Sequence, residues 1–561
     1  MMLSTLLPQA LQRSCRTLVH RTSRYNRRQN GSLNSTPHIT YFQPPPEPPK
    51  AKRRILRNVF LYTALVGAGA YAHAWLLDIP FLSLGLETLE EDVGALQDAM
   101  QEALHAAAAK GAPPMDLERS QEMLESRAGY SVTQTAVAHT AQLASNLPCE
   151  DQWSSGAFDV YHDPKKDWVE WAVFDGHAGP RTAMLLKEWL PGTVASTMWA
   201  EKCFGRKYVP NDSHIIKVIK QIFVQVDEDI CNTALRHIQN GLPDRAAVVA
   251  AASVAFSGSC ALLALYDPAN HVLRVANTGD SRAVLGRWDG AQSKYIAQPL
   301  STDQTGFNKD EVSRINAQHP GEDVVDPATG RIHGLAVSRA FGDARWKWPQ
   351  EVNRRAQEWF WGPKPRSDSM IKTPPYLTAE PEIMESKIST GERPDFLIMA
   401  SDGLWDQMSN EDAVTCVQMW LDKNKPTNFL EKLEEAPSSS MNQLATSGQK
   451  SQGAHPGLYE KRDSGFANVS DLDGEDEDVY YDKDEQTLKW RVSPKHFIVE
   501  DENCGIHMIK NALGGRRRDL FTGVMSVQPP LSRNVRDDIT VHVIFFGQSV
   551  DTPVIGSKQK A

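Results

Sequence analysis

Short apolar runs bounded by aspartates recur in this sequence from about residue 128 onward. Four places show the pattern: 171–174 (WAVF) runs into Asp175, 272–276 (VLRVA) leads to Asp280, 396–400 (FLIMA) leads to Asp402, and Asp537 opens 539–546 (ITVHVIFF). Side chains of a β-strand have fixed directions, so acids at strand ends can converge on one edge of a sheet while the apolar runs stay buried. The pattern predicts a sheet protein with a cluster of carboxylates at one edge.

The predicted cluster needs a cation. Several carboxylates held close together repel one another unless a positive charge neutralises them. Oxygen ligands without clustered Cys or His favour Mg²⁺ or Mn²⁺ over zinc. Gly176, which follows Asp175, would let the backbone approach a ligand closely, so that its carbonyl oxygen could also bind metal. A single Asp-Gly pair is usually a turn, but the joint pattern indicates an acidic metal site of a hydrolytic enzyme.

Five motifs carry a family resemblance: FDGHAG (174–179), NTGDSRAVLG (277–286), AVSRAFGD (336–343), SDGLWD (401–406) and RDDIT (536–540). In this order they resemble the metal-dependent protein serine/threonine phosphatases, the type 2C or PPM family, and the resemblance covers about residues 128–548. Within that family, SNLPCED (145–151) and NCGIHMIKNALGG (503–515) are similar to the branch of mitochondrial pyruvate dehydrogenase phosphatases.

The resemblance implies an α+β fold. It would be a four-layer αββα sandwich in which helices flank two central antiparallel β-sheets, with the metal site at one end of the sandwich. The sequence agrees with this expectation, because the apolar spacing over 187–200 and 215–239 is typical of helices.

The resemblance also implies a set of metal ligands. Asp151 and Asp175 would hold two Mg²⁺ or Mn²⁺ ions, with Gly176 contributing its carbonyl oxygen. Asp402 and Asp537 would complete the second-metal side. The remaining expected ligands are Glu150, acting through a water, and Asp280 and Asp406, near a third and weaker metal.

Other residues would act on the substrate. His177 matches the proposed general acid of the family. Many relatives place a phosphate-binding arginine four residues before the first metal glutamate, whereas this sequence has Asn146 there, which weakens a direct charge contact to phosphate. Arg339, Gly342 and Asp343 belong to a motif for which packing and loop shape are favoured over direct catalysis.

The chemistry expected of such a site is hydrolysis of phosphoserine or phosphothreonine by a metal-activated water. No covalent phosphoenzyme is needed, so Cys149 beside the site is interpreted as a bystander. The resemblance points to the E1α subunit of the pyruvate dehydrogenase complex as substrate. The alternatives are a phosphatase of the intermembrane space with another phosphoprotein substrate, a catalytically inactive member of the family that acts as a scaffold, and a different metallohydrolase such as a nuclease or nucleotide phosphatase.

The N-terminal region is basic, unlike the rest of the chain. Residues 1–46 contain six arginines and no acid, and residues 1–57 carry a net charge of about +10, which leaves about −20 for the rest of a chain with net charge −10. An Arg- and Ser-rich segment without acids is typical of a mitochondrial transit peptide, which we predict for residues 1–46. A basic arm for nucleic acid is the alternative, and the acidic body disfavours it.

A second targeting feature follows. Residues 59–77 have no formal charge and approach the length of a membrane span, so we predict a single transmembrane segment within a Pro-rich and basic spacer at 47–84. Basic residues before the span and acids after it would place the body in the intermembrane space by the positive-inside rule. That orientation conflicts with a substrate in the mitochondrial matrix, and the sequence leaves both locations open.

The remaining segments have no expected catalytic role. Residues 85–127 are interpreted as a helical linker, residues 549–561 as a C-terminal tail, and residues 425–495 as a low-complexity, acidic insertion into the phosphatase domain. The seven cysteines show no CxxC and no regular spacing, which favours free thiols.

Overall fold

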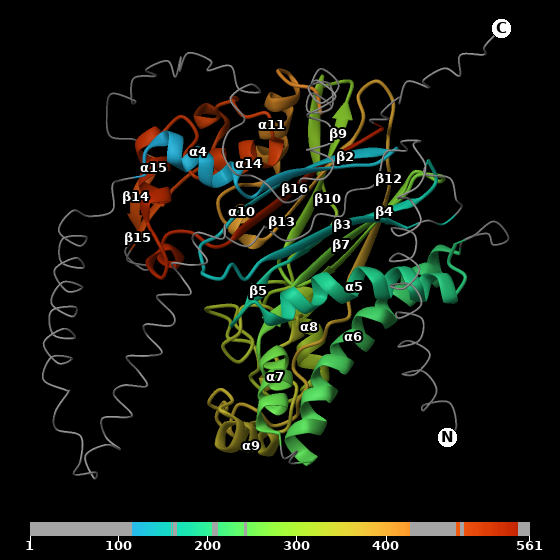
Figure 1. The fold of residues 1–561 in the computed structure, drawn as a ribbon, viewed down its shortest axis with the longest axis vertical. Coiled ribbons are helices and arrows are strands. Elements are labelled where there is room, and N and C mark those ends of the chain that lie inside the picture. Colours follow the sequence, from blue (N-terminus) through green and yellow to red (C-terminus); the bar gives the residue numbers. More distant parts are fainter. Residues whose placement is uncertain are drawn as a thin grey trace, which may run out of the picture. The chain divides into compact units, whose positions relative to one another are not determined.

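The structure, a computed structural model, describes residues 115–158, 160, 165–204, 211–240, 244–426, 478–482 and 487–547. From Leu117 onward the described residues belong to one compact unit (Figure 1). The predicted transit peptide, the apolar segment 59–77, most of the predicted linker and most of the predicted insertion lie outside the described residues. No helix in the described part is both long and apolar enough to cross a membrane.

Two antiparallel sheets form the centre of the unit. The five-stranded sheet has the order β12-β8-β7-β4-β3 and the six-stranded sheet has the order β1-β2-β16-β13-β9-β10. The strands of the first are β3 (Gln152–Phe158), β4 (Trp168–Phe174), β7 (Ala261–Asp267), β8 (Val272–Thr278) and β12 (Glu382–Lys387). Those of the second are β1 (Ala128–Val132), β2 (Ala136–Leu143), β9 (Arg282–Asp289), β10 (Lys294–Pro299), β13 (Phe396–Ala400) and β16 (Ile539–Phe546).

The alternation of side chains in β4 shows how the two sheets share a core. Val169, Trp171 and Val173 face the other sheet and belong to the cluster that contains Leu397 of β13 and Phe546 of β16. Trp168, Ala172 and Phe174 of β4 belong to the other cluster, which includes residues of the covering helices. Because both faces are covered, β4 is apolar along nearly its whole length rather than alternating.

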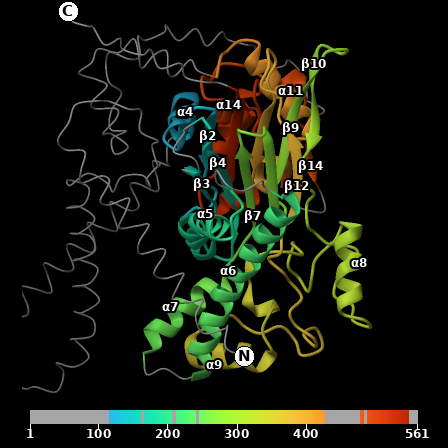
Figure 2. The ribbon, with the colours of Figure 1, turned by 90° about the vertical axis from the view of Figure 1, so that its right-hand side faces the viewer.

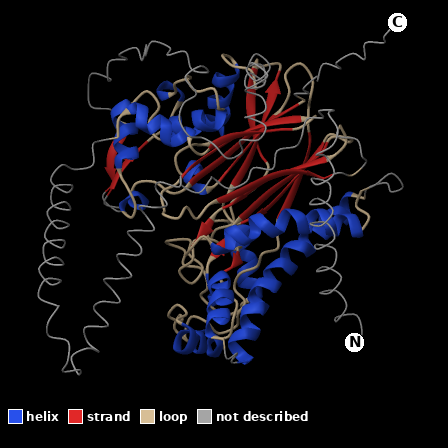
Figure 3. Ribbon diagram, in the orientation of Figure 1, coloured by secondary structure: helices blue, strands red, loops and turns tan. Residues whose placement is uncertain are grey.

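Helices cover the outer face of each sheet (Figures 2 and 3). On the five-stranded side, α5 (Arg181–Ala200) contacts β3 and β4 and packs on α6 (Asp212–Asn240). On the six-stranded side, α11 (Asn410–Leu421) contacts β9 and β10, and α14 (Cys504–Ala512) contacts β2 and β16. The other helices of the described residues are α4 (Leu117–Glu125), α7 (Arg245–Phe256), α8 (Lys309–Gln318), α9 (Gln350–Phe360), α10 (Asp402–Trp405) and α15 (Arg518–Ser526), with the 3₁₀ turns η1 (Ala344–Trp346), η2 (Pro494–His496) and η3 (Leu531–Asn534).

The layers confirm the predicted α+β fold, a four-layer αββα sandwich. The predicted helices at 187–200 and 215–239 are the main parts of α5 and α6, and the four predicted strands are β4, β8, β13 and β16. Two features were not predicted. Helix α4, within the predicted linker, packs against β2 and α15, and the described part of the predicted insertion contains a hairpin of β14 (Val479–Asp482) and β15 (Thr487–Trp490).

A third, three-stranded sheet of very short strands lies beside the sandwich. Its order is β11 (Phe341–Gly342), β6 (Gly258–Ser259) and β5 (Gly176–His177). Gly258 on the central strand pairs with His177 on one side and Gly342 on the other. This small sheet therefore joins two of the sequence motifs that are far apart in the chain.

Candidate active site

The predicted carboxylates come from strand ends that the fold brings to one end of the sandwich. Asp151 precedes β3, Asp175 follows β4, and Asp402 begins α10 directly after β13. Ser401 bridges the two sheets, because its hydroxyl donates to Asp151 Oδ2 at 2.7 Å and accepts the backbone N–H of Thr540 at 2.9 Å. The backbone N–H of Asp402 lies 3.5 Å from Asp175 Oδ2. Asp402 is thus close to Asp175 and is linked to Asp151 through the adjacent Ser401.

Close backbone packing around Gly176 supports the same cluster. A Cβ at this position would lie 2.3 Å from the carbonyl oxygen of Glu150 and 3.1 Å from the Cβ of Ala183. Glu150 in turn accepts the backbone N–H of Gly179 at 2.6 Å with its Oε1. Only glycine allows the segments that carry Asp151 and Asp175 to approach this closely.

Asp538, which the sequence interpretation did not single out, organises the loop before Asp151. Its buried carboxylate accepts backbone N–H groups from Ser145, from Asn146 at 2.9 Å and from Glu150 at 2.7 Å. It is the neighbour of Asp537, whose carboxylate forms an ion pair with Arg533. The doubled acid of the RDDIT motif was the available signal, and the structure shows that its two members have different partners.

Electrostatics of the cluster favour a bound positive charge. Burial, and next the neighbouring Asp538, raise the pKa of Asp151 to about 8. Burial and Asp280 raise the pKa of Asp402 to about 6. Burial, followed by Asp402 and Asp151, raises the pKa of Asp175 well above its ordinary value. A group of buried, mutually repelling oxygen donors fits a hard divalent cation such as Mg²⁺ or Mn²⁺.

Asp280 lies at the edge of this cluster together with a thiol. A carboxylate oxygen of Asp175, one of Asp280 and the Sγ of Cys260 all lie within 4.8 Å of one another. Cys260 donates to Asp280 Oδ1 at 3.2 Å, and burial followed by the charge of Asp280 raises the pKa of the thiol well above its usual range. Cys260 is therefore a neutral hydrogen-bond donor here, and its position was not predicted from the sequence.

Two further residues considered in the sequence analysis are Asp406 and Cys149. Asp406 follows α10 and is exposed, and its backbone N–H donates to the carbonyl oxygen of Asp402 at 2.8 Å. The Cys149 side chain is buried, and burial followed by the charge of Asp151 raises its thiol pKa. That environment is the reverse of one that activates a nucleophilic cysteine, as expected for a bystander. The described cysteines, six of the seven in the chain, are all free.

His177 is held by Asp343. The Nε2 of His177 and Oδ2 of Asp343 are 2.6 Å apart, with the carboxylate fully buried and the imidazole partly exposed. Burial disfavours the protonated imidazole, but the charge of Asp343 and the hydrogen bond to it outweigh burial and raise the pKa of His177. The pair lies over Gly258, where a Cβ would be 2.1 Å from Nε2 and 2.3 Å from Oδ2. Asp343 therefore positions the predicted general acid, a role that the sequence did not reveal.

The rest of the AVSRAFGD motif has structural contacts. Arg339 is buried and binds Glu311 and Glu382, and its Nη1 donates to the carbonyl oxygen of Glu380 at 2.8 Å. Gly342 has φ of +71°, and a Cβ there would lie 2.2 Å from the carbonyl oxygen of Ser257. These contacts fit the predicted packing role for Arg339 and Gly342.

A family model and several known proteins match this chain. Residues 141–447 match the family model described as Protein phosphatase 2C. The chain is 37% identical over 417 residues to a protein phosphatase 2C homologue of Schizosaccharomyces pombe, with 72% of this chain and 79% of that protein covered. It is 36% identical over 443 residues to the mitochondrial [pyruvate dehydrogenase [acetyl-transferring]]-phosphatase 1 of Saccharomyces cerevisiae, with 74% and 69% covered. A serine-threonine phosphatase 2C from Toxoplasma gondii matches with 14% identity and a TM-score of 0.41, over 74% of this chain and 96% of that one.

The chain belongs to the protein phosphatase 2C family. It is a metal-dependent protein serine/threonine phosphatase, and the resemblance inferred from the five motifs is confirmed. Its similarity to proteins named as pyruvate dehydrogenase phosphatases agrees with the branch indicated by the SNLPCED and NCGIHMIKNALGG segments.

Proposed function

We propose that this enzyme dephosphorylates phosphoserine or phosphothreonine of the pyruvate dehydrogenase complex in mitochondria. The observation that carries the chemistry is the convergence of Asp151, Asp175 and Asp402 at one end of the sandwich. The observation that favours the substrate is 36% identity, over most of both chains, to a yeast protein named as the pyruvate dehydrogenase phosphatase.

We assign the ligands as follows. Asp151 and Asp175 would hold two divalent ions, with Gly176 contributing its carbonyl oxygen. Asp402 and Asp537 would complete the second-metal side, and Glu150 would act through a water. When bound, the ions would lower the pKa of a water and neutralise charge on the phosphoryl oxygens. The backbone of Glu150 donates to Asp538, so the loop held by Asp538 positions Glu150 and the adjacent Asp151.

His177 would donate a proton to the serine or threonine oxygen as it leaves. Since Asp343 engages Nε2, Nδ1 is the ring nitrogen left to supply that proton. The charge of Asp343 raises the pKa of His177 and so favours the imidazolium form, and the hydrogen bond between them fixes the ring. This assistance matters because an alkoxide is a poor leaving group.

Asp280 and Asp406 are assigned to a weaker third ion. The carboxylate of Asp280 within 4.8 Å of Asp175 supports a site that shares this edge of the cluster. The exposed position of Asp406 after α10 is consistent with weak binding, since an ion there would keep much of its hydration.

The test of the function is release of phosphate from a phosphoserine peptide copied from the E1α subunit, with and without Mn²⁺. We expect Mn²⁺-dependent activity that is lost in Asp402→Asn. An inactive but folded wild-type protein would instead support the scaffold alternative, and cleavage of nucleotides or nucleic acid in preference to the phosphopeptide would support another metallohydrolase.

Location is a separate proposal. Residues 1–46 as a transit peptide, and similarity to proteins named as mitochondrial, support a mitochondrial enzyme. We further propose that residues 59–77 anchor it to the inner membrane. Protease treatment of intact mitochondria and of mitoplasts distinguishes the two faces, because digestion after outer-membrane rupture alone would place the phosphatase domain in the intermembrane space rather than the matrix.

The domain boundaries complete the proposal. The family match at 141–447 falls inside the proposed phosphatase domain of residues 128–548 and runs into the insertion proposed at 425–495. Helix α4 packs on β1 and β2, so any truncated form of the protein that is meant to fold should keep the residues from Leu117 onward.

A further inference from the structure

A cation lies among the proposed metal ligands. Arg533 is in η3, four residues before Asp537, and its Nη1 forms an ion pair with Asp537 Oδ1. Its side chain is 46% exposed. Its charge also reaches Glu150 and Asp402, where it opposes the rise in pKa that burial causes.

Two other arginines near the cluster are engaged elsewhere. Arg282 binds both carboxylate oxygens of Asp303 and donates to Asn410 Oδ1 at 3.0 Å. Arg536 is buried, and its Nη1 donates to the backbone carbonyl oxygens of Val524 and Val527. Neither can turn to a ligand without breaking these bonds. Arg533, in contrast, combines exposure with contact to a proposed metal ligand.

The side-chain amide of Asn146, the residue predicted to contact substrate, is already hydrogen-bonded within the protein. Its side-chain Nδ2 donates to Glu150 Oε2 at 3.2 Å and to Asp538 Oδ2 at 3.3 Å. An amide that faces two carboxylates brings no positive charge to a phosphate. The loop that carries it is bound to the segment of Arg533, since Ser532 Oγ donates to the carbonyl oxygen of Ser145 at 2.6 Å. Asn146 and Arg533 are therefore on adjoining segments at the same side of the cluster.

We propose that Arg533 binds the phosphoryl group of the substrate, exchanging its contact with Asp537 for one or two phosphoryl oxygens when substrate enters. This inference rests on the proposed function, because it assumes that the carboxylate cluster is where the phosphoryl group reacts. The planar guanidinium matches two oxygens of a phosphate, and such charge-assisted pairs are the stronger class of hydrogen bond. The partial exposure of Arg533 means that this exchange costs little desolvation.

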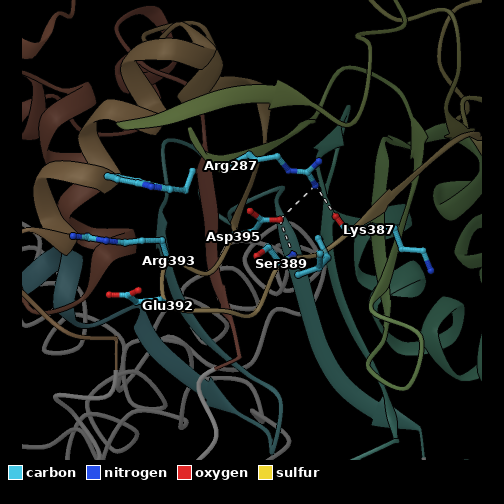
Figure 4. Close-up of a pocket in the computed structure, with 8 residues that line it drawn as sticks. Arg287, Lys387, Ser389, Glu392, Arg393 and Asp395 are labelled. Carbon is cyan, nitrogen blue, oxygen red and sulfur yellow. Dashed lines mark hydrogen bonds and ion pairs between the residues drawn. The ribbon is translucent and has the colours of Figure 1, made fainter. Parts of the chain in front are cut away.

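The decisive variants are Arg533→Met, which keeps much of the apolar stem and removes the charge, and Arg533→Lys, which keeps the charge but not the fork. The matched control is Arg287→Met. The side chain of Arg287 is 42% exposed, and that of Asp395 is buried. Figure 4 shows the ion pair between them. Asp395 precedes β13 and Asp402 follows it, and the five residues of this strand span about 16 Å at a rise of about 3.3 Å per residue.

Inhibition by inorganic phosphate at saturating Mn²⁺ is the primary measurement, with KM for the phosphoserine peptide beside it. We expect Arg533→Met to weaken phosphate inhibition about tenfold or more and to raise KM, Arg533→Lys to give an intermediate effect, and Arg287→Met to leave both unchanged. The second measurement is the Mn²⁺ concentration at half of the maximal thermal shift, which needs no activity.

The outcomes separate the possibilities. Weaker phosphate inhibition with an unchanged Mn²⁺ midpoint supports the proposal. Unchanged phosphate inhibition at saturating Mn²⁺, with a shifted Mn²⁺ midpoint, overturns it and leaves Arg533 as a group that only positions Asp537. If Arg533→Met does not fold, Arg533→Lys decides by the same criteria. An inactive wild-type enzyme would instead refute the proposed function, and this result differs from every outcome that tests Arg533 itself.

Discussion

Replacing Gly176 with alanine tests how closely the two metal-binding segments are packed. The new methyl group would meet the carbonyl oxygen of Glu150 at 2.3 Å and the Cβ of Ala183 at 3.1 Å. Carbon and oxygen atoms approach to about 3.3 Å without strain, so the backbone of Glu150 would have to move by about 1 Å. The flexible end of a side chain cannot absorb this shift, because the atom that clashes belongs to the backbone.

The expected cost has two parts. Overpacking of this size destabilises a protein by about 1–3 kcal/mol. The larger effect falls on activity, because moving Glu150 and Asp151 by about 1 Å changes the geometry of the proposed metal site. Misplacement of this size lowers reaction rates by about 10²-fold. Gly176→Ala should therefore remain folded, with kcat/KM for a phosphoserine peptide reduced about a hundredfold and a higher Mn²⁺ requirement.

Gly192→Ala is the matched control. Gly192 is inside α5, and a Cβ there would have no atom within 4 Å. Alanine is the better helix former by about 1 kcal/mol, so this variant should raise Tm and leave activity unchanged. Wild-type kcat/KM and an unchanged Mn²⁺ requirement in Gly176→Ala would refute the reasoning, because the glycine would then not be setting the approach of the two segments.

Three further predictions concern proton transfer, metal binding and stability. His177→Ala should slow hydrolysis of a phosphoserine peptide by about 10²–10⁴-fold but have much less effect on p-nitrophenyl phosphate, whose leaving group needs no proton; equal losses on both would contradict the general-acid assignment. Mn²⁺ at about 100 times its dissociation constant should stabilise the wild type by about 2.7 kcal/mol, seen as a rise in Tm, and should have a smaller effect on Asp402→Asn; equal rises would count against Asp402 as a ligand. Hydrogen bonds from Arg339 and its neighbours outweigh burial and lower the pKa of Glu311 to about 2 from an ordinary value of 4.5. The stabilisation from ionised Glu311 is therefore complete above pH 4.5 and lost as the pH falls toward 2, so urea unfolding of Glu311→Gln should show a deficit at pH 7 that shrinks in acid; a deficit independent of pH would show that the charge is not responsible.

The sequence was most informative where the relevant signal is local. Each apolar run that ends in an acid is a continuous stretch of chain, and β4, β8, β13 and β16 form where these runs predicted strands. The same holds for α5 and α6, whose apolar spacing is contained within each segment. The resemblance of five ordered motifs then indicated the arrangement of layers, which propensity and periodicity alone do not determine.

The partners of the site residues were harder to predict. His177 and Asp343 are 166 residues apart, and they meet because β5 and β11 both pair with β6. Asp538 and the loop that it holds are nearly 400 residues apart. Nothing in either segment specifies the other, and a GD or DD pair in isolation is compatible with a turn. Cys260 likewise had no local signal in the sequence, since it joins the site only through its hydrogen bond to Asp280, which lies 20 residues further along the chain.

The sequence by itself determined the kinds of groups available: carboxylates at strand ends, a glycine after Asp175, and an asparagine at position 146. These follow from chemistry and short-range pattern, and they suffice to indicate a site for a hard divalent cation. Only the tertiary structure determined which partners each acidic residue contacts. Asp538 accepts backbone N–H groups while its neighbour Asp537 faces Arg533, and Asp343 is a positioning residue rather than a packing one. The physical reason is that hydrogen bonds and charge interactions act over a few ångströms, and only folding brings segments separated by hundreds of residues within that range.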